Sequence, residues 1–336
     1  MLNSIRMVLG KNYWRRGIQS TFFLFYCWVG IRFYQYVLWA LGKSPLFVER
    51  PIAVEAFLPL GAFVSFKRLV LTGNYDLIHP AALSIFLLAL VLALLLRKSF
   101  CGYLCPIGAG FTLVEKIGEK WGITRRPPRW LSYLLYVPKY LLLAGFVYIF
   151  AQMGVRDIEA FMSTQYWRVS DTRMLLFFLE PTVITLVVTG VVLLGNLLIK
   201  GFWCQGLCPY GALLGLISLL SPVAVSRDAK GCISCGKCSR ACPARIRVEA
   251  KNRVSSPGCM GCGECVSVCP VDNCLSFSVG YGRVKRRIPA CGIPLATLLL
   301  LFMMWVWSVQ AGAWYTPVDK QQIRKDHEVV RLLSHY

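Results

Sequence analysis

Residues 231–243 read GCISCGKCSRACP, and residues 258–270, after a short connector, read GCMGCGECVSVCP. Each half has the spacing C-x2-C-x2-C-x3-C-P of the bacterial two-cluster ferredoxins, in which the cysteine before proline ligates the other cluster. The stretch therefore predicts a ferredoxin-like domain with two [4Fe–4S] clusters. The first cluster would be held by Cys232, Cys235, Cys238 and Cys269, and the second by Cys259, Cys262, Cys265 and Cys242.

Two other interpretations of these cysteines fit the spacing less well. Disulfides persist in oxidising compartments, whereas the charge pattern described below places this stretch in the cytoplasm. Structural zinc usually takes two ligand pairs with a longer gap between them. Here three cysteines at two-residue gaps are followed by Cys-Pro, and the whole pattern occurs twice.

The composition is that of an integral membrane protein. Of the 336 residues, 56 % are hydrophobic and only 16 % are charged, whereas soluble domains carry about 25 % charged residues. Apolar runs long enough to cross a bilayer recur along the chain. The formal net charge is +21, and the basic residues flank these runs, so the charge indicates contact with membrane lipids and not with nucleic acid.

Five apolar runs are predicted to cross the membrane, at residues 18–42, 80–96, 130–152, 175–199 and 288–309. Most basic residues lie in segments 1–16, 97–129 and 200–287, which places the N-terminus and the cysteine motifs in the cytoplasm and the C-terminus outside. In this topology residues 51–73, which contain Glu55 and Pro59, do not cross the membrane. They are predicted to form a re-entrant or interfacial segment. The expected location is the cytoplasmic (inner) membrane of a prokaryote.

The predicted fold class is an all-α polytopic membrane protein of about five helices with an inserted bacterial 2[4Fe–4S] ferredoxin-like domain. A transmembrane bundle is expected over residues 1–225, with duplicated half-units at about 79–121 and 175–221. The ferredoxin-like domain is expected at 226–282, the last transmembrane helix at 283–315 and a polar tail at 316–336.

The duplication is visible in a repeated C-x3-C-P motif. Residues 100–109, FCGYLCPIGA, match residues 203–212, WCQGLCPYGA. Proline suits the first helical position, so Cys105 and Cys208 are predicted to be helix N-caps. A helix N-terminus favours the thiolate, and we therefore expect lowered thiol pKa values at these two cysteines.

One pair of cysteines supplies two ligands, and two pairs on the same side of the membrane would supply four. We therefore expect one site near the inner interface, formed by Cys101, Cys105, Cys204 and Cys208. A third iron–sulfur cluster is one interpretation. Redox-active dithiols or bound copper, which soft thiolates favour, are a second. Reduced structural thiols at a tight helix–helix turn are a third.

The ferredoxin-like domain, called the cassette from here on, and the repeated motif together resemble the membrane polyferredoxin family. That family includes the quinol dehydrogenase membrane subunit of periplasmic nitrate reductase, the ferredoxin half of the nitrous-oxide reductase maturation protein, and the assembly protein of cbb3-type cytochrome oxidase. The resemblance covers about 200 residues, from the first C-x3-C-P to the end of the cassette. It implies an electron-transfer subunit that works with a partner redox protein, such as a cytochrome.

A quinone is the expected membrane substrate. Glu55, Lys67 and His79 are ionisable residues in or beside the broken segment, and such residues within membrane segments mark functional sites. A quinone site beside the inner C-x3-C-P motifs is the rival placement. Whether the chain is itself an enzyme stays open, because no catalytic acid, base or substrate pocket is evident.

The predicted function is electron transfer between the quinone pool and a partner redox protein, through two or three [4Fe–4S] clusters. The alternative is a copper-handling or cytochrome oxidase assembly factor, with reductase activity at the C-x3-C-P thiols. The two differ in the metal that these thiols hold.

Overall fold

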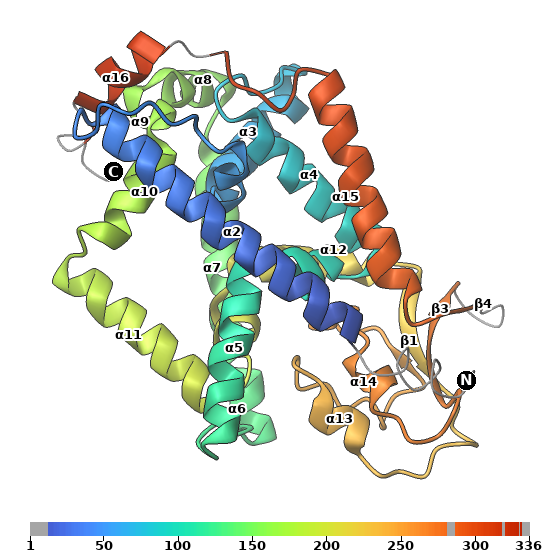
Figure 1. Ribbon diagram of the computed structural model, residues 1–336. Coiled ribbons are helices and arrows are strands. Elements are labelled where there is room, and N and C mark those ends of the chain that lie inside the picture. The colour runs from blue at the N-terminus through green and yellow to red at the C-terminus, as the bar shows by residue number, and fades with distance from the viewer. Residues whose placement is uncertain (1–12, 281–285, 318–319, 329, 331–336) are drawn as a thin grey trace. The chain divides into compact units, whose positions relative to one another are not determined.

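The computed structural model describes residues 13–280, 286–317, 320–328 and 330, and these are mostly helical (Figure 1). Its longer helices are α2 (Tyr13–Ala40), α3 (Pro59–Thr72), α4 (Pro80–Leu96), α5 (Pro106–Lys120), α7 (Val137–Gln152), α10 (Ser170–Leu179), α11 (Val183–Leu198) and α15 (Gly292–Gln310). The shorter helices are α6 (Arg129–Leu134), α8 (Val155–Ser163), α9 (Gln165–Arg168), α12 (Pro209–Ile217), α13 (Lys237–Ala241), α14 (Glu264–Ser267) and α16 (Lys320–Glu328).

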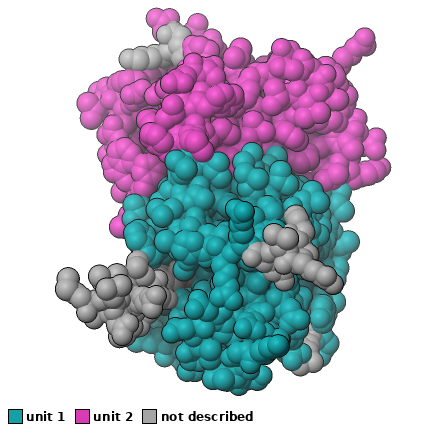
Figure 2. Space-filling model, turned by 90° about the vertical axis from the view of Figure 1, so that its right-hand side faces the viewer, with its two compact units in different colours: residues 1–23, 89–144, 191–301 teal, residues 24–88, 145–190, 302–336 magenta. Residues whose placement is uncertain are grey.

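The chain divides into two compact units, which Figure 2 distinguishes by colour. Unit 1 contains residues 1–23, 89–144 and 191–301, and unit 2 contains residues 24–88, 145–190 and 302–336. All of the motif cysteines belong to unit 1, whereas Glu55, Lys67 and His79 belong to unit 2. Each unit is described by itself below.

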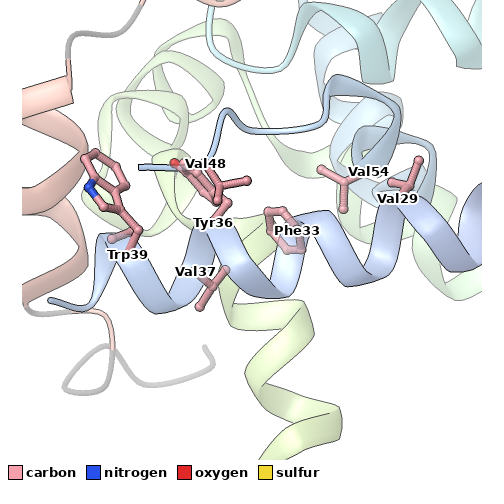
Figure 3. Close-up of a cluster of buried hydrophobic side chains, with 8 residues drawn as sticks. Val29, Phe33, Tyr36, Val37, Trp39, Val48 and Val54 are labelled. Carbon is pink, nitrogen blue, oxygen red and sulfur yellow. The ribbon is translucent and has the colours of Figure 1, made fainter. Parts of the chain in front are cut away.

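Unit 2 has a core built on one face of α2. Val29, Phe33, Tyr36 and Val37 recur at helical spacing and are each at most 3 % exposed. Figure 3 shows these side chains with Val48 and Val54, which belong to the segment that follows the helix. This packing folds the segment back along α2, so the residues after Ala40 stay close to the helix that they leave.

The segment 51–73 is broken, as the sequence predicts. A 3-10 helix, η1 (Ile52–Phe57), is followed by α3, which has Pro59 in its first turn and ends at Gly73 with φ of 74°. Proline fits the first turn of a helix, and glycine tolerates the left-handed conformation that ends one. The 14 residues of α3 span about 21 Å, which is less than the hydrocarbon core of about 30 Å.

Within the described part of the chain, two stretches are long and apolar enough to cross a membrane, Trp130–Gln152 and Gly292–Gln310. The pair α10 and α11 makes a third only if it is counted as one bent span, and α4 is shorter, with 17 residues. Five spans were predicted, whereas two or three of the described stretches are long and apolar enough to be spans. The prediction of one continuous span over 175–199 is wrong, because α10 and α11 meet at an angle of 81°. The bend falls at Pro181, and proline disfavours helical conformation in the residue before it.

The cassette in unit 1 contains a four-stranded sheet in addition to helices. Its strands are β1 (Val223–Arg227), β2 (Arg253–Val254), β3 (Leu275–Val279) and β4 (Arg286–Ile288). They pair in the order β2-β1-β3-β4, and all pairs are antiparallel. β1 and β3 pair over their whole lengths, from Val223 opposite Val279 to Arg227 opposite Leu275. The sheet thereby joins the two ends of the cassette and leads directly into α15.

Arg97 fastens the end of α4 to the cassette. Its guanidinium donates hydrogen bonds to the carbonyl oxygens of Ser218 (2.9 Å) and Val254, and its backbone N–H donates to Ser221 Oγ (3.2 Å). The sequence predicts Arg97 and Lys98 as positive charges that stop a span at the interface. Both are 1 % exposed, so they lie inside unit 1.

Candidate functional site

Two hollows in the cassette are lined by cysteines. The first is lined by Cys232, Cys235, Cys238, Cys269 and Cys274. The second is lined by Cys242, Cys259, Cys262 and Cys265. Each hollow brings together the triplet of one motif and the Cys-Pro cysteine of the other. Cys274, which belongs to neither motif, is a buried fifth thiol at the first hollow.

The same turn builds both triplets. Gly236 and Gly263 follow the second cysteine of each triplet and have φ angles of 68° and 74°, a conformation that glycine adopts readily. The turn leads into the short helices α13 and α14, which carry the third cysteine of each triplet. α13 ends at Ala241 with Cys242 as its C-cap, and the Pro243 that follows has no N–H to continue the helix.

The donor sets fit iron–sulfur clusters. All fifteen cysteines are free thiols, so each hollow offers the four thiolates that a [4Fe–4S] cluster needs. No three possible ligands in the described part of the chain converge as they would around a single metal ion. The second hollow is the more enclosed one, since all of its cysteines are buried, whereas Cys232, Cys235 and Cys269 at the first are partly exposed.

The repeated C-x3-C-P motif has the same local structure in both copies. A π-helical segment, Phe100–Leu104 in the first copy and Phe202–Leu207 in the second, precedes an N-cap cysteine. The Sγ of Cys105 accepts a hydrogen bond from the N–H of Gly108 (3.4 Å), and the Sγ of Cys208 accepts one from Gly211 (3.2 Å). Both cysteines are therefore helix N-caps, as predicted.

The expected lowering of the thiol pKa values is wrong. Burial raises the pKa of Cys101 to about 11 and that of Cys105 to about 12, and the neighbouring thiols of the set add to the effect at Cys105. The pKa of Cys204 rises well above its usual range because of burial and because Cys208, Cys105 and Cys101 lie near it. The N-cap hydrogen bonds act in the opposite direction but are outweighed. The four thiols therefore lie close enough together to interact, and each is partly exposed. A bound metal would supply the positive charge that favours their thiolate forms.

Both copies of the motif contact the residues that line the second hollow. A Cβ atom at Gly102 would lie 2.8 Å from the carbonyl oxygen of Met260, and one at Gly201 would lie 3.1 Å from that of Pro243. The Tyr103 hydroxyl donates a hydrogen bond to the carbonyl oxygen of Gly261 (3.3 Å). The two loops therefore approach the more enclosed hollow closely, and glycine is required where the backbones nearly touch.

Arg15 joins the first copy to the second hollow. Its Nε donates to the carbonyl oxygen of Gly102 (3.3 Å), and its guanidinium pairs with Glu264 (2.8 Å), the first residue of α14. The amide of Gln19 donates to the same carbonyl oxygen (3.0 Å). The sequence places Arg15 in a basic N-terminal segment, and its structural partners could not be read from that pattern.

Three charged residues near the four thiols belong to no recognisable sequence motif, so the sequence analysis did not assign them to this site. Lys98 and Lys139 are buried, at 1 % and 2 % exposed. Glu115 is buried on α5 and accepts a hydrogen bond from the N–H of Gly201 (2.8 Å). Burial raises the pKa of Glu115 to about 7, so close to neutral pH this carboxyl is half protonated.

Of the residues predicted for a quinone, unit 2 brings Glu55 and His79 together. His79 Nδ1 lies 3.4 Å from Glu55 Oε1, and both side chains are buried. Lys67 lies elsewhere, with its ammonium group donating to the carbonyl oxygens of Phe150 (2.6 Å) and Met153 (2.6 Å). Those carbonyls belong to the C-terminal end of α7, so Lys67 caps that helix.

Arg50 and Asp171 complete the buried cluster around His79, and the sequence analysis missed both. The Arg50 guanidinium pairs with Glu55 (2.8 Å) and with Asp171 (2.7 Å), and it lies 3.3 Å from His79 Nδ1. The other ring nitrogen of His79 lies 2.8 Å from the carbonyl oxygen of Trp167. Arg50 carries one positive charge, and the carboxylates of Glu55 and Asp171 carry two negative ones. The cluster therefore has one negative charge in excess, which a proton on His79 would neutralise.

Comparisons with known proteins identify related chains. Residues 224–270 match the family described as "4Fe-4S dicluster domain", and residues 78–124 and 181–227 each match the one described as "4Fe-4S binding domain". These last two matches each contain one copy of the C-x3-C-P motif.

The chain is 37 % identical over 317 residues to the putative electron transport protein YccM of Escherichia coli K12, covering 93 % of this chain and 89 % of that protein. It is 31 % identical over 147 residues to the methylamine utilization ferredoxin-type protein MauN of Methylorubrum extorquens, covering 43 % of this chain and 47 % of that one. It is also 31 % identical over 200 residues to protein NirI of Paracoccus denitrificans, covering 56 % and 27 %. No solved structure matches the chain.

Proposed function

Because the chain belongs to the membrane polyferredoxin family, we propose that it exchanges electrons between the quinone pool and a partner redox protein. The general function, iron–sulfur electron transport, agrees with the names of its relatives. When bound, [4Fe–4S] clusters supply one-electron oxidation and reduction. The quinone and the partner are the parts of the proposal that need direct tests.

The cassette would hold its two clusters with one cysteine exchanged between the motifs. The composition of the two hollows supports this assignment, since the triplet of each motif shares its hollow with the Cys-Pro cysteine of the other. The partly exposed first hollow is the natural place for contact with a partner redox protein. The enclosed second hollow would face the membrane part of the chain.

The four C-x3-C-P cysteines would hold a third cluster. The observation that carries this proposal is that two helices of the same kind, each starting at an N-cap cysteine, bring four partly exposed cysteines close together. Both loops also contact the residues around the second hollow. A redox centre held there would connect the membrane part of the chain to the cassette.

The orientation is proposed from the charge pattern and from the composition of unit 1. The helix ends assigned to the cytoplasm are the starts of α2, α7 and α15 and the ends of α4 and α11. All of them belong to unit 1, together with the motif cysteines. This grouping supports a cytoplasmic cassette in a multi-pass protein of the cytoplasmic membrane.

For the quinone, we propose the buried cluster of Glu55 and His79 as the group that takes or gives the protons of the reaction. Arg50 and Asp171 extend that cluster. The charge balance at His79 favours uptake of one proton, which quinone chemistry requires. Lys67 has no place in this cluster and would act as a helix cap.

Electron exchange with quinone can be measured directly. The anaerobically purified protein, reduced with dithionite and desalted, is mixed with menadione, and cluster reoxidation is followed by stopped-flow absorbance. We expect rapid reoxidation of the wild type. In a Cys105→Ser variant we expect slowing by about tenfold or more, equivalent to about 1.4 kcal/mol in the barrier.

Two results would argue against the quinone proposal. One is wild-type protein whose clusters are reduced by dithionite but are not reoxidised by menadione. The other is a Cys105→Ser variant that reacts as fast as the wild type, since the four-cysteine site would then not connect quinone to the cassette. A Cys27→Ser variant, which alters a thiol outside the motifs, is the matched control and should react at the wild-type rate.

A further inference from the structure

Among the described residues of unit 1, two buried lysines have no acidic partner. Lys98 follows α4, and its Nζ donates a hydrogen bond to the carbonyl oxygen of Gly211 (3.0 Å), near the start of α12. Lys139 lies in the first turn of α7, with its Nζ 4.9 Å from the centre of the Tyr136 ring and 5.0 Å from that of Tyr140. In the described part of the chain, neither lysine forms an ion pair.

Both ammonium groups lie near thiols of the C-x3-C-P motifs. Lys98 and Lys139 each interact electrostatically with Cys101 and Cys208, and Lys139 also interacts with Cys204. The two lysines are close enough to repel each other. Two buried ammonium groups therefore lie beside the cysteines of the C-x3-C-P motifs.

Burying a cation without a counter-charge is unfavourable by several kcal/mol. Glu115, a carboxyl that interacts with Cys204, accepts a hydrogen bond from Gly201 N–H and pairs with neither lysine. A hydrogen bond to a carbonyl and contacts with aromatic rings compensate only partly, because they supply no negative charge. The buried lysines therefore indicate that the site is completed by an anion.

Counting charges identifies which occupant would balance the site. Four thiolates bring four negative charges and an oxidised [4Fe–4S] core brings two positive ones, so two negative charges remain, which two ammonium groups neutralise. Protonated thiols or a pair of disulfides would leave both lysines unbalanced. One copper(I) ion on two thiolates would neutralise only one of them.

We propose that Lys98 and Lys139 are the counter-charges of an anionic iron–sulfur cluster at the four-cysteine site, and that they raise its reduction potential. This inference rests on the proposed third cluster. Reduction adds a negative charge to the cluster, and fixed positive charges nearby favour the reduced form, most strongly where those charges are buried, as both lysines are. Both lysines are positioning residues, since they act through the cluster and not on a substrate.

The test is a redox titration of the full-length, anaerobically purified protein, followed by EPR. Lys98→Met and Lys139→Met remove one charge each and keep an unbranched side chain. We expect each to lower the midpoint potential of the third cluster by 59 mV or more, which is tenfold in the equilibrium constant of a one-electron reduction. The cassette clusters should keep their potentials. Lys98→Arg should retain the wild-type potential, and so should Lys116→Met, which removes an exposed charge from α5.

The outcomes separate this inference from the function on which it rests. An unchanged potential in both methionine variants, with the third cluster present, overturns the role of the lysines and leaves the cluster intact. If Lys98→Met loses the cluster while Lys98→Arg keeps it, the counter-charge is supported. If Lys98→Met and Lys98→Arg both lose the cluster, Lys98 is required for packing and the inference fails. Wild-type protein with no third cluster contradicts the proposed function itself.

Discussion

Two cysteine substitutions within one predicted ligand set should remove no more iron from the protein than one substitution does. Cys269→Ser is expected to remove about four iron atoms, the content of one cluster. Adding Cys235→Ser should remove no more, because both cysteines line the first hollow. Adding Cys262→Ser instead should remove about four further atoms, because Cys262 lines the second. Iron and acid-labile sulfide analysis of anaerobically purified protein gives the result.

The pattern is distinctive because sequence proximity predicts the opposite. Cys269 and Cys262 belong to the same motif, whereas Cys269 and Cys235 are separated by the whole connector. Cys274→Ser is the matched control: it alters a buried thiol of the first hollow outside the ligand set, and no iron should be lost. Additional iron loss in the Cys269 and Cys235 pair, without additional loss in the Cys269 and Cys262 pair, would reverse the assignment.

Replacing Arg50 by leucine should be among the most destabilising substitutions in unit 2. Arg50 is the partner of Glu55 and Asp171, whose side chains are 1 % and 3 % exposed. Removing one member of a buried ion pair leaves an uncompensated charge and costs about 3–5 kcal/mol. We expect a loss of stability of this size in denaturant unfolding of the detergent-solubilised protein.

Arg68→Leu provides the comparison. Arg68 pairs with Glu159 at 2.7 Å, the same distance as the pair of Arg50 with Asp171, but the Glu159 side chain is 43 % exposed. Water can solvate that carboxylate when its partner is removed, so the expected loss is about 1 kcal/mol. Equal losses in the two variants would mean that the Arg50 cluster is hydrated, and its proposed role in proton transfer would lose its basis.

Local features were predictable from the sequence because they depend on neighbouring residues. The spacing of cysteines, with glycine after the second and proline after the fourth, specifies the turns that build each cysteine triplet. Proline after Cys105 and Cys208 predicted their N-cap positions correctly. The bend at Pro181 could have been predicted by the same reasoning, but the apolar pattern on both sides of it favoured a single span.

Features that depend on contacts between distant residues could not be predicted. Arg50 and Asp171 are 121 residues apart in the chain, and neither has a recognisable motif. Lys98 was interpreted as an interfacial charge because it follows an apolar run, and only the packing reveals its burial. The thiol pKa values depend on a competition between a local effect, the helix terminus, and a tertiary one, burial. The sequence reports only the local effect, so the direction was predicted wrongly.

The third cluster is the central claim, and iron analysis of wild type and Cys105→Ser tests it most directly. Anaerobically purified wild-type protein should contain about twelve iron atoms per chain, and the variant about eight, because three clusters hold four each. The EPR signals of the two cassette clusters should persist in the variant. About eight iron atoms in both proteins, with copper bound by the wild type and lost from Cys105→Ser, would contradict the third cluster and support a metal-handling function.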